Sequence, residues 1–240
     1  MTIQAQAMYF KDLNQMIRTS DAHIVKVEQC LGQRYIGCGT GGKQITIYGT
    51  PGNALGAYLD GSEIWVFGNA QDATGDTMND GAIYVYGSAG DATGYAMRGG
   101  KIFVQGDAGY RCGIHMKAYQ DKSPLLLIGG TAGSFLGEYQ AGGTIIVLGL
   151  HTDAEVPVGN FCATGMHGGK IYLRCDALPS DLPANILVEP AEESDLLKIR
   201  PYLDEFCARF EESLDEILDK PFFRLTPDTQ NPYKQLYTPN

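Results

Sequence analysis

The sequence has no long apolar run, no excess of cationic side chains and no signal-like start. No segment approaches the roughly 18 consecutive apolar residues of a membrane span, so we expect none. The 18 lysines and arginines against 28 aspartates and glutamates give a net charge of −10, which argues against nucleic acid and anionic membranes as partners. Residues 1–10 lack the basic and apolar layout of a signal peptide, so we expect a cytoplasmic protein.

Patterns that bind metals or activate nucleophiles are also missing. No C-x-x-C pair occurs among the six cysteines, which predicts scattered reduced thiols rather than a zinc or Fe–S site on this chain. These cysteines are Cys30, Cys38, Cys112, Cys162, Cys175 and Cys207. The four histidines have no acidic partner at metal-ligand spacing, and His115 is interpreted as a packed or rim residue. We therefore predict no catalytic, cofactor-binding or metal-binding residue.

The dominant positive feature is a repeat of 19 residues. One position of the repeat is isoleucine at residues Ile45, Ile64, Ile83 and Ile102. The same position continues at Leu126, Ile145 and Ile171, where the spacing from the preceding residue of the series is 19 residues plus inserts of 5, 0 and 7 residues. Two further positions of the repeat are glycine. One is at Gly49, Gly68, Gly87 and Gly106, and the other is at Gly56, Gly75, Gly94 and Gly113. A fixed period of this kind is typical of repeat architectures, in which each unit buries its apolar edge against its neighbours.

Each repeat has the composition of a strand bounded by turns. Cores such as Ile64-Trp-Val and Ile83-Tyr-Val place β-branched residues two positions apart, which suits a strand, and the flanking glycines permit turns with positive φ. A helical repeat is not expected, because the 31 glycines interrupt every stretch of helical periodicity and glycine disfavours helices. The predicted fold class is an all-β solenoid, a right-handed parallel β-helix of about seven coils with a short N-terminal and a longer C-terminal helical appendage.

Further residues align in the same register. One column holds Ala70, Ala89, Ala108 and Ala132, another Leu59, Met78, Met97 and Met116, and a third Leu55, Thr74, Thr93, Cys112 and Leu136. We interpret all three as stacked interior. Asn53, Asp72 and Asp91 align at a turn, where each side chain is expected to bond its own turn backbone; the alternative is a catalytic pair of stacked carboxylates.

The segments outside the repeat predict three domains. Residues 1–20 are expected to form an N-terminal helical cap, with the helix at 8–19, and residues 21–176 the repeat. Residues 177–240 are expected to hold a linker, an amphipathic helix at 201–219 with Pro201 in its first turn, and an extended tail. The inserts at 117–124 and 151–160 are expected to be loops.

The strand pattern also predicts an apolar stripe on the outer face. If Ile64 and Val66 face inward, alternate residues face outward, and these are mostly large and aromatic. The outward residues are Tyr48, Trp65, Phe67, Tyr84, Tyr86, Phe103, Leu127, Ile146, Leu148 and Tyr172. A patch of this size is normally covered, here by the C-terminal helix or by a partner protein. The candidate interface residues are Trp65, Phe67, Tyr84, Tyr86, Phe103, Phe206 and Phe210.

Several strings in the repeat carry a family resemblance. They are Gly32-Gln-Arg-Tyr-Ile-Gly37, Ile47-Tyr-Gly-Thr-Pro-Gly-Asn-Ala-Leu-Gly56, Asn69-Ala-Gln-Asp72, Gly94-Tyr-Ala-Met-Arg-Gly-Gly-Lys-Ile-Phe103, Gly109-Tyr-Arg-Cys-Gly-Ile-His-Met116 and Gly165-Met-His-Gly-Gly169. With the glycine register, they resemble the C-terminal GXGXG domain of the glutamate synthase large subunit, and more closely its stand-alone version. The match covers about residues 21–175, and the tail around Pro232-Tyr233 is similar. The C-type subunit of formylmethanofuran dehydrogenase shares the repeat.

The resemblance implies a bracing role without catalysis. In glutamate synthase, the amidotransferase centre, the FMN site and the 3Fe–4S cluster belong to other domains. We therefore expect no active site and no cofactor on this chain. FMN and an iron–sulfur cluster are expected only on partner subunits. The expected partners are an amidotransferase subunit and an FMN-binding synthase subunit. Association of several copies of this chain into a homo-oligomer is a further possibility.

Three functions remain open from the sequence. The first is a non-catalytic assembly subunit of a glutamate synthase-type oxidoreductase, in glutamate biosynthesis and nitrogen assimilation. The second is a component similar to the C-type subunit, within a formylmethanofuran dehydrogenase or formyltransferase/hydrolase complex. The third is an independent β-helix enzyme acting on a carbohydrate or acyl substrate.

Overall fold

The computed structural model describes residues 1–228 of the chain. Within that range, eleven strands form one sheet and three helices accompany it. The strands are β1 (Thr2–Gln4), β2 (Ile24–Leu31), β3 (Gln44–Thr50), β4 (Asp60–Phe67), β5 (Asp80–Val85), β6 (Lys101–Val104), β7 (Leu125–Ile128), β8 (Ala141–Val147), β9 (Gly168–Arg174), β10 (Ile186–Pro190) and β11 (Phe222–Pro227). The helices are α1 (Phe10–Thr19), α2 (Glu193–Phe210) and α3 (Leu214–Leu218).

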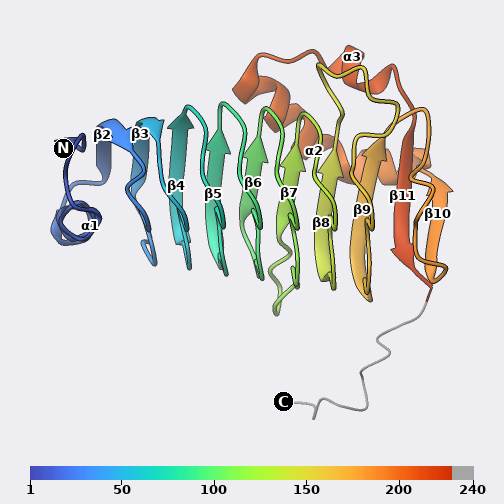
Figure 1. The fold of residues 1–240 in the computed structure, drawn as a ribbon, viewed down its shortest axis with the longest axis horizontal. Coiled ribbons are helices and arrows are strands. Elements are labelled where there is room, and N and C mark those ends of the chain that lie inside the picture. The colour runs from blue at the N-terminus through green and yellow to red at the C-terminus, as the bar shows by residue number, and fades with distance from the viewer. Residues whose placement is uncertain (229–240) are drawn as a thin grey trace, which may run out of the picture.

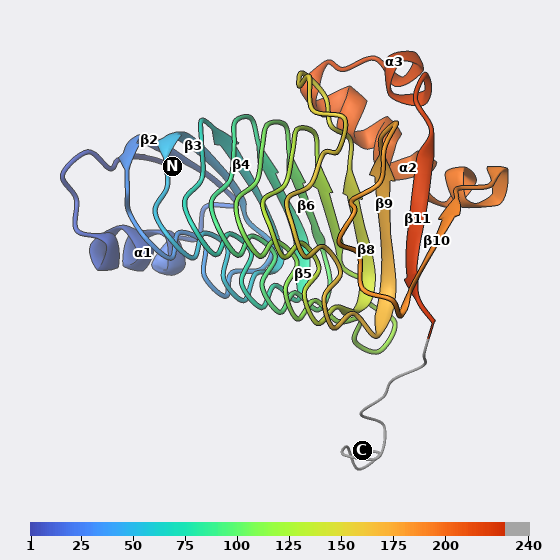
Figure 2. The ribbon, with the colours of Figure 1, turned by 45° about the vertical axis from the view of Figure 1, so that its right-hand side comes forward.

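The strands follow the order of the chain over most of the sheet. From β1 to β9 they pair in parallel in sequence order, and β11 then lies antiparallel between β9 and β10 (Figure 1). The turned view shows that the connections between successive strands return through a layer of turns beside the sheet (Figure 2). Helix α1 lies at the β1 end of the sheet, and α2 and α3 lie towards the β9 end.

The predicted all-β solenoid, a right-handed parallel β-helix of about seven coils, is wrong. The described chain instead has a single open sheet of mixed strand direction, with β1 and β10 at its two edges. Each repeat contributes only one strand, because the rest of the repeat is rich in glycine and in residues with positive φ. There the ladder is reduced to isolated bridges, such as Ala70 to Ala89 and Ala89 to Ala108. The last repeat pairs with a C-terminal strand rather than with another parallel strand.

The inner column of the repeat is confirmed. Ile45, Ile64, Ile83 and Ile102 are direct partners in the register, followed by Leu126, Ile145 and Ile171, and all are completely buried. Two glycines show why the opposite turn must stay small. A Cβ on Gly56 would lie 2.6 Å from the Ile83 side chain, and one on Gly75 would lie 2.3 Å from Ile102. The columns of Met78 and Thr74 are also buried, as predicted.

The aligned acidic residues connect neighbouring repeats. The Asp72 carboxylate accepts a hydrogen bond from the backbone N–H of Asp91 at 3.0 Å, and that of Asp91 accepts one from Tyr110 at 2.8 Å. The expectation that each side chain bonds its own turn is therefore wrong. The turns stack in register, which places a backbone N–H of the next repeat within reach of each carboxylate.

The ends of the chain differ in part from prediction. Helix α1 is confirmed, and it buries Leu13 and Ile17. Helix α2 starts eight residues before Pro201, because Glu192 and Asp195 form a capping box, and it stops at Glu211, which adopts φ 60°. The tail was expected to be extended, and its first part pairs with the sheet as β11; residues 229–240 lie outside the described range.

Both inserts lie outside the main ladder, as predicted. The segment 117–124 is a tight turn closed by a bridge between Tyr119 and Lys122. In the segment 151–160, Val158 forms an isolated bridge to Ala132 and extends the alanine column.

Replacing Ile83 by aspartate should unfold the protein. Ile83→Asp places an unpaired carboxylate between two buried isoleucines, which costs several kcal/mol out of a typical domain stability of about 5–15 kcal/mol. Ile24→Asp is the matched control, because Ile24 is 58% exposed. Thermal melting should show a large loss for the first variant and little change for the second. Equal melting temperatures would mean that the inner column does not support the sheet.

Candidate interaction surface

The outward side chains of the sheet form the aromatic stripe, defined here as Tyr48, Trp65, Phe67, Tyr84, Tyr86, Phe103, Leu127, Ile146, Leu148 and Tyr172. They face away from the inner column because successive residues of a strand point to opposite faces. Rings from neighbouring strands stack, with centroids 4.4 Å apart for Trp65 and Tyr84 and 5.4 Å apart for Tyr84 and Phe103. The stripe is therefore one continuous surface across the strands.

Helix α2 covers most of this stripe. Its buried residues Ile199, Leu203, Phe206 and Phe210 recur at helical spacing and pack in one cluster with the sheet residues from Tyr84 to Tyr172. Phe206 lies against Gly129, where an added Cβ would be 2.7 Å from its ring. The expected packing of residues 201–219 on the stripe is confirmed for this helix.

Polar contacts fix the second half of α2 on the sheet. The Tyr84 hydroxyl donates to one Glu205 carboxylate oxygen at 2.7 Å, and the Lys101 ammonium lies 2.7 Å from the other. The Arg209 guanidinium lies over Trp65 at 4.8 Å and over Tyr84 at 5.4 Å. Burial, and then the neighbouring Glu205, raise the pKa of Tyr84, so its hydroxyl stays protonated and able to donate.

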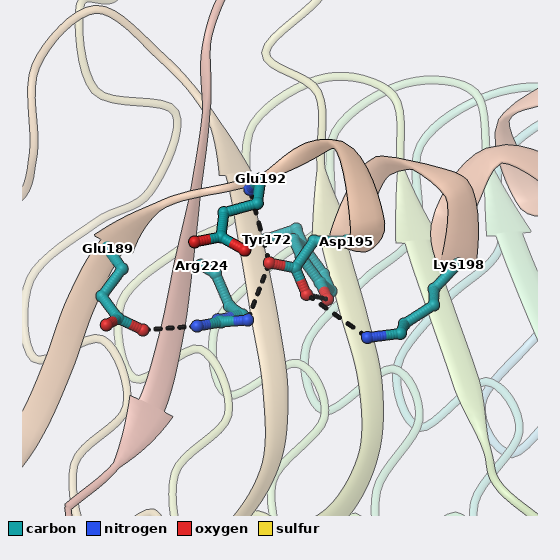
Figure 3. Close-up of polar contacts among 6 residues, drawn as sticks. All are labelled: Tyr172, Glu189, Glu192, Asp195, Lys198 and Arg224. Carbon is teal, nitrogen blue, oxygen red and sulfur yellow. Dashed lines mark hydrogen bonds and ion pairs between the residues drawn. The ribbon is translucent and has the colours of Figure 1, made fainter.

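A buried carboxylate anchors the first turn of α2 (Figure 3). Asp195 is completely buried and accepts hydrogen bonds from the Arg224 guanidinium at 2.7 Å and the Tyr172 hydroxyl at 3.3 Å. Arg224 also bonds Glu189 on β10, and Lys198 lies 4.0 Å from Asp195. One carboxylate thus joins α2 to β9 and β11, and through Arg224 to β10.

The charge state of Asp195 depends on these partners. Burial alone would raise its pKa, but the Arg224 guanidinium, the backbone N–H of Glu192 and the Tyr172 hydroxyl together hold that pKa below its usual range. The bonds to Glu189 and Asp195 raise the pKa of Arg224 in return. The pair is therefore ionised at neutral pH.

The N-terminal end of the stripe is uncovered. Tyr48 is 38% exposed and Phe67 40% exposed, whereas Tyr84 and Phe103 are buried. The stack nevertheless continues without a gap: Tyr48 to Phe67 at 5.0 Å, Phe67 to Tyr86 at 4.6 Å, and Tyr86 to Phe210 of α2 at 4.9 Å. Lys26 lies over the Tyr48 ring at 4.7 Å. The apolar surface thus extends beyond the last residue of α2.

The predicted interface residues therefore separate into two groups. Tyr84, Phe103, Phe206 and Phe210 are buried within the chain, while Trp65 and Tyr86 are half-buried at the margin of α2 and Phe67 is exposed. Sequence reasoning missed Asp195 and Arg224, which lie 29 residues apart. The available signal was an acidic residue three positions after Glu192, which is the pattern of a capping box.

The side chains of Cys112, Cys162 and His115 lie outside the cluster of α2 and the stripe. No group of three or more His, Cys, Asp or Glu side chains within residues 1–228 is arranged to hold a metal ion. Burial raises the pKa of the Cys112 and Cys162 thiols to about 12, which leaves them protonated at neutral pH. His115 stacks on Tyr139 with centroids 5.3 Å apart, as expected of a rim residue. None of the helices in the described part combines the length and apolar character that a bilayer crossing requires.

Comparisons with known proteins identify a family and two similar proteins. The sequence pattern of the GXGXG motif family matches residues 6–227. The uncharacterized protein MJ1350 of Methanocaldococcus jannaschii is 44% identical over 99% of this chain and 96% of its own length. A chain of the formyltransferase/hydrolase complex FhcABCD from Methylorubrum extorquens, solved with methylofuran, has a similar fold: the TM-score is 0.64 at 19% identity, over 88% of this chain and 76% of that one.

These comparisons correct one expectation. They give no support to glutamate synthase, glutamate biosynthesis or nitrogen metabolism, and the similar solved fold comes from a formyltransferase/hydrolase complex. The glycine register could not separate the two assignments, because both resemblances rest on the same repeat.

Truncating Phe206 should destabilise the protein strongly. Its ring is completely buried between α2 and the sheet, so Phe206→Ala should lower the free energy of unfolding by about 3–5 kcal/mol. Leu197→Ala, on the same helix at 66% exposure, should have a small effect. Urea unfolding measures both variants, and similar losses for the two would contradict the packing of α2 on the stripe.

Asp195 should make the stability depend on pH. Because its folded-state pKa is depressed, its contribution is present above the unfolded value of about 3.9 and is lost as pH falls through the folded value. Asp195→Asn should therefore be less stable than wild type at about pH 7, with a difference that narrows below about pH 4. Asp204→Asn, an exposed carboxylate paired with Arg200, is the control. A gap between wild type and Asp195→Asn that is constant with pH would refute this role for the charge.

Proposed function

Because the chain belongs to the GXGXG motif family, we propose that it is a non-catalytic assembly subunit of a formyltransferase/hydrolase-type complex. It contributes a rigid sheet and a docking surface, and it brings no cofactor of its own. The formyl chemistry is assigned to partner subunits. This proposal takes the second of the three functions considered from the sequence.

The observation that carries the proposal is the uncovered end of the aromatic stripe. Two stacked rings there, Tyr48 and Phe67, remain more than one-third exposed although the rest of the same surface is covered by α2. Exposed aromatic surface that continues a buried cluster is typical of a protein interface, where Tyr, Trp and Phe are enriched. A partner subunit on this patch would complete the cover that α2 begins.

The fold likeness supports the kind of complex. The similar solved chain belongs to a formyltransferase/hydrolase assembly, and its likeness extends over 88% of this chain. At 19% identity the likeness is one of fold, so it supports the assignment by analogy. The buried, protonated thiols of Cys112 and Cys162 are consistent with a structural role for the cysteines.

The test is purification of the tagged full chain from its own cells. Wild type should elute with formyltransferase and hydrolase subunits and their activities, and the chain produced alone should be inactive. The double variant Tyr48→Glu, Phe67→Glu should fold normally, because both side chains face solvent, but should elute without these subunits. Tyr58→Glu is the control, since Tyr58 is 54% exposed and lies outside the stripe.

Three results would contradict the proposal. One is a wild-type chain that elutes alone, and another is a double variant that keeps its partners. The third is co-elution with an amidotransferase and a flavin-dependent synthase in place of the formyl-transferring subunits.

A further inference from the structure

A cleft lies between helix α1 and the turns of the first repeats. Its volume is about 360 Å³, which is within the range of small-molecule sites. The lining residues are Phe10, Lys11, Asn14, Gln15, Arg18, Tyr35 and Cys38. This cleft is separate from the aromatic stripe, and no part of the proposed function uses it.

The walls of the cleft are held in place. Helix α1 is fixed from below by Leu13 and Ile17, which are completely buried. On its side, the Asn14 amide donates to the Arg34 carbonyl at 2.8 Å and to the Phe10 carbonyl at 2.7 Å. The helix and the turn that carries Tyr35 are therefore joined directly, and the cleft is preformed.

The cleft is cationic in an acidic protein. Residues 1–43 hold five basic side chains (Lys11, Arg18, Lys26, Arg34, Lys43) against three acidic ones (Asp12, Asp21, Glu28), although the whole chain carries a net charge of −10. Lys11 and Arg18 lie seven residues apart on α1, hence on one face, and both line the cleft. Among the described residues neither forms an ion pair.

Aromatic rings form the rest of the wall. The centroids of Phe10 and Tyr35 are 6.1 Å apart, and the Arg34 guanidinium lies 5.8 Å from the Phe10 ring. Flat apolar walls next to unpaired cations suit a ligand that has both a planar body and a negative group.

We propose that this cleft binds a small organic anion, a carboxylate attached to a planar apolar body. The carboxylate is bound by Lys11 and Arg18, and the planar body lies against Phe10 and Tyr35. At Cys38, the Asp76 carboxylate opposes the charge of Arg18. The Lys11 ammonium lies 5.9 Å from the centroid of the Tyr9 ring and, within residues 1–228, forms no ion pair that would neutralise it.

Cys38 provides a reporter inside the cleft. Its thiol is half-buried, and so is that of Cys207 on α2, while the other four cysteines are buried. The charges around the two thiols differ in balance. One cation, Arg18, and one carboxylate, Asp76, act on Cys38. Two carboxylates, Asp204 and Glu212, and one cation, Arg200, act on Cys207. The ratio of alkylation by iodoacetate, an anion, to that by iodoacetamide, which is neutral, cancels the thiolate fraction of each site. It therefore measures the local attraction for a carboxylate.

The first experiment uses the full wild-type chain and peptide mapping by mass spectrometry. The iodoacetate to iodoacetamide ratio should be higher at Cys38 than at Cys207 by about tenfold at low salt, and the difference should shrink at about 0.5 M salt. The planar carboxylate 2-naphthoate should protect Cys38 and leave Cys207 reactive. Neither acetate nor 2-naphthylmethanol, which carry only the charge or only the ring, should protect at the same concentration.

The second experiment removes the cations. Lys11→Gln combined with Arg18→Gln should abolish both the Cys38 preference for iodoacetate and the protection by 2-naphthoate, with Cys207 unchanged as evidence of folding. Arg98→Gln, which removes a similar cation over the ring of Tyr119, is the matched control and should behave as wild type. Equal ratios at the two cysteines in wild type, or protection by 2-naphthylmethanol as strong as by 2-naphthoate, would overturn the proposal.

Discussion

The hydrogen-bonded register between neighbouring parallel strands determines the rest of this structure. With 19 residues from strand to strand in most repeats, the inner isoleucines from Ile45 to Ile102 stack on one another. The outward rings of the same strands, from Tyr48 to Phe103, also stack. A slip of one residue would exchange the two faces, because side chains alternate along a strand. The inner face then becomes a closed column, as seen for Ile64, Ile83 and Ile102. The outer face becomes an apolar surface that requires cover.

Helix α2 covers only part of this outer surface, and the rings of Tyr48 and Phe67 remain exposed at its N-terminal end. Helix α2 is anchored at one end by the buried Asp195 and at the other by Arg209 over Trp65. Its last residue, Phe210, meets Tyr86 edge to face, and the stack then continues to Phe67 and Tyr48 without a helix above it. Part of one apolar surface thus stabilises the chain, and the remainder stays exposed.

Much of the local structure could be predicted from the sequence, because the repeat makes each position visible several times. The inner column, the outward stripe, helix α1 and the loops at both inserts follow from spacing alone. The overall architecture could not, since the ladder in the turn layer depends on how glycine-rich segments pair. Contacts between distant segments were also invisible: Asp195 meets Arg224 only because β11 returns beside β9. The cleft was missed for the same reason, since it forms where α1 meets a turn of the repeat.

The position of β11 in the sheet determines when the C-terminal strands can pair during synthesis. Although β10 precedes it in the sequence, β11 lies between β10 and β9, so β10 has no neighbour in the sheet until residues 222–227 are in place. During synthesis, β9 therefore presents a free edge while almost the entire repeat has already been made. Only the late strand brings Arg224 to Asp195 and covers that edge. A chain that ends before residue 222 would keep its repeats but would leave the edge of β9 unpaired. Such an edge can pair with another chain, so the truncated protein should aggregate more readily.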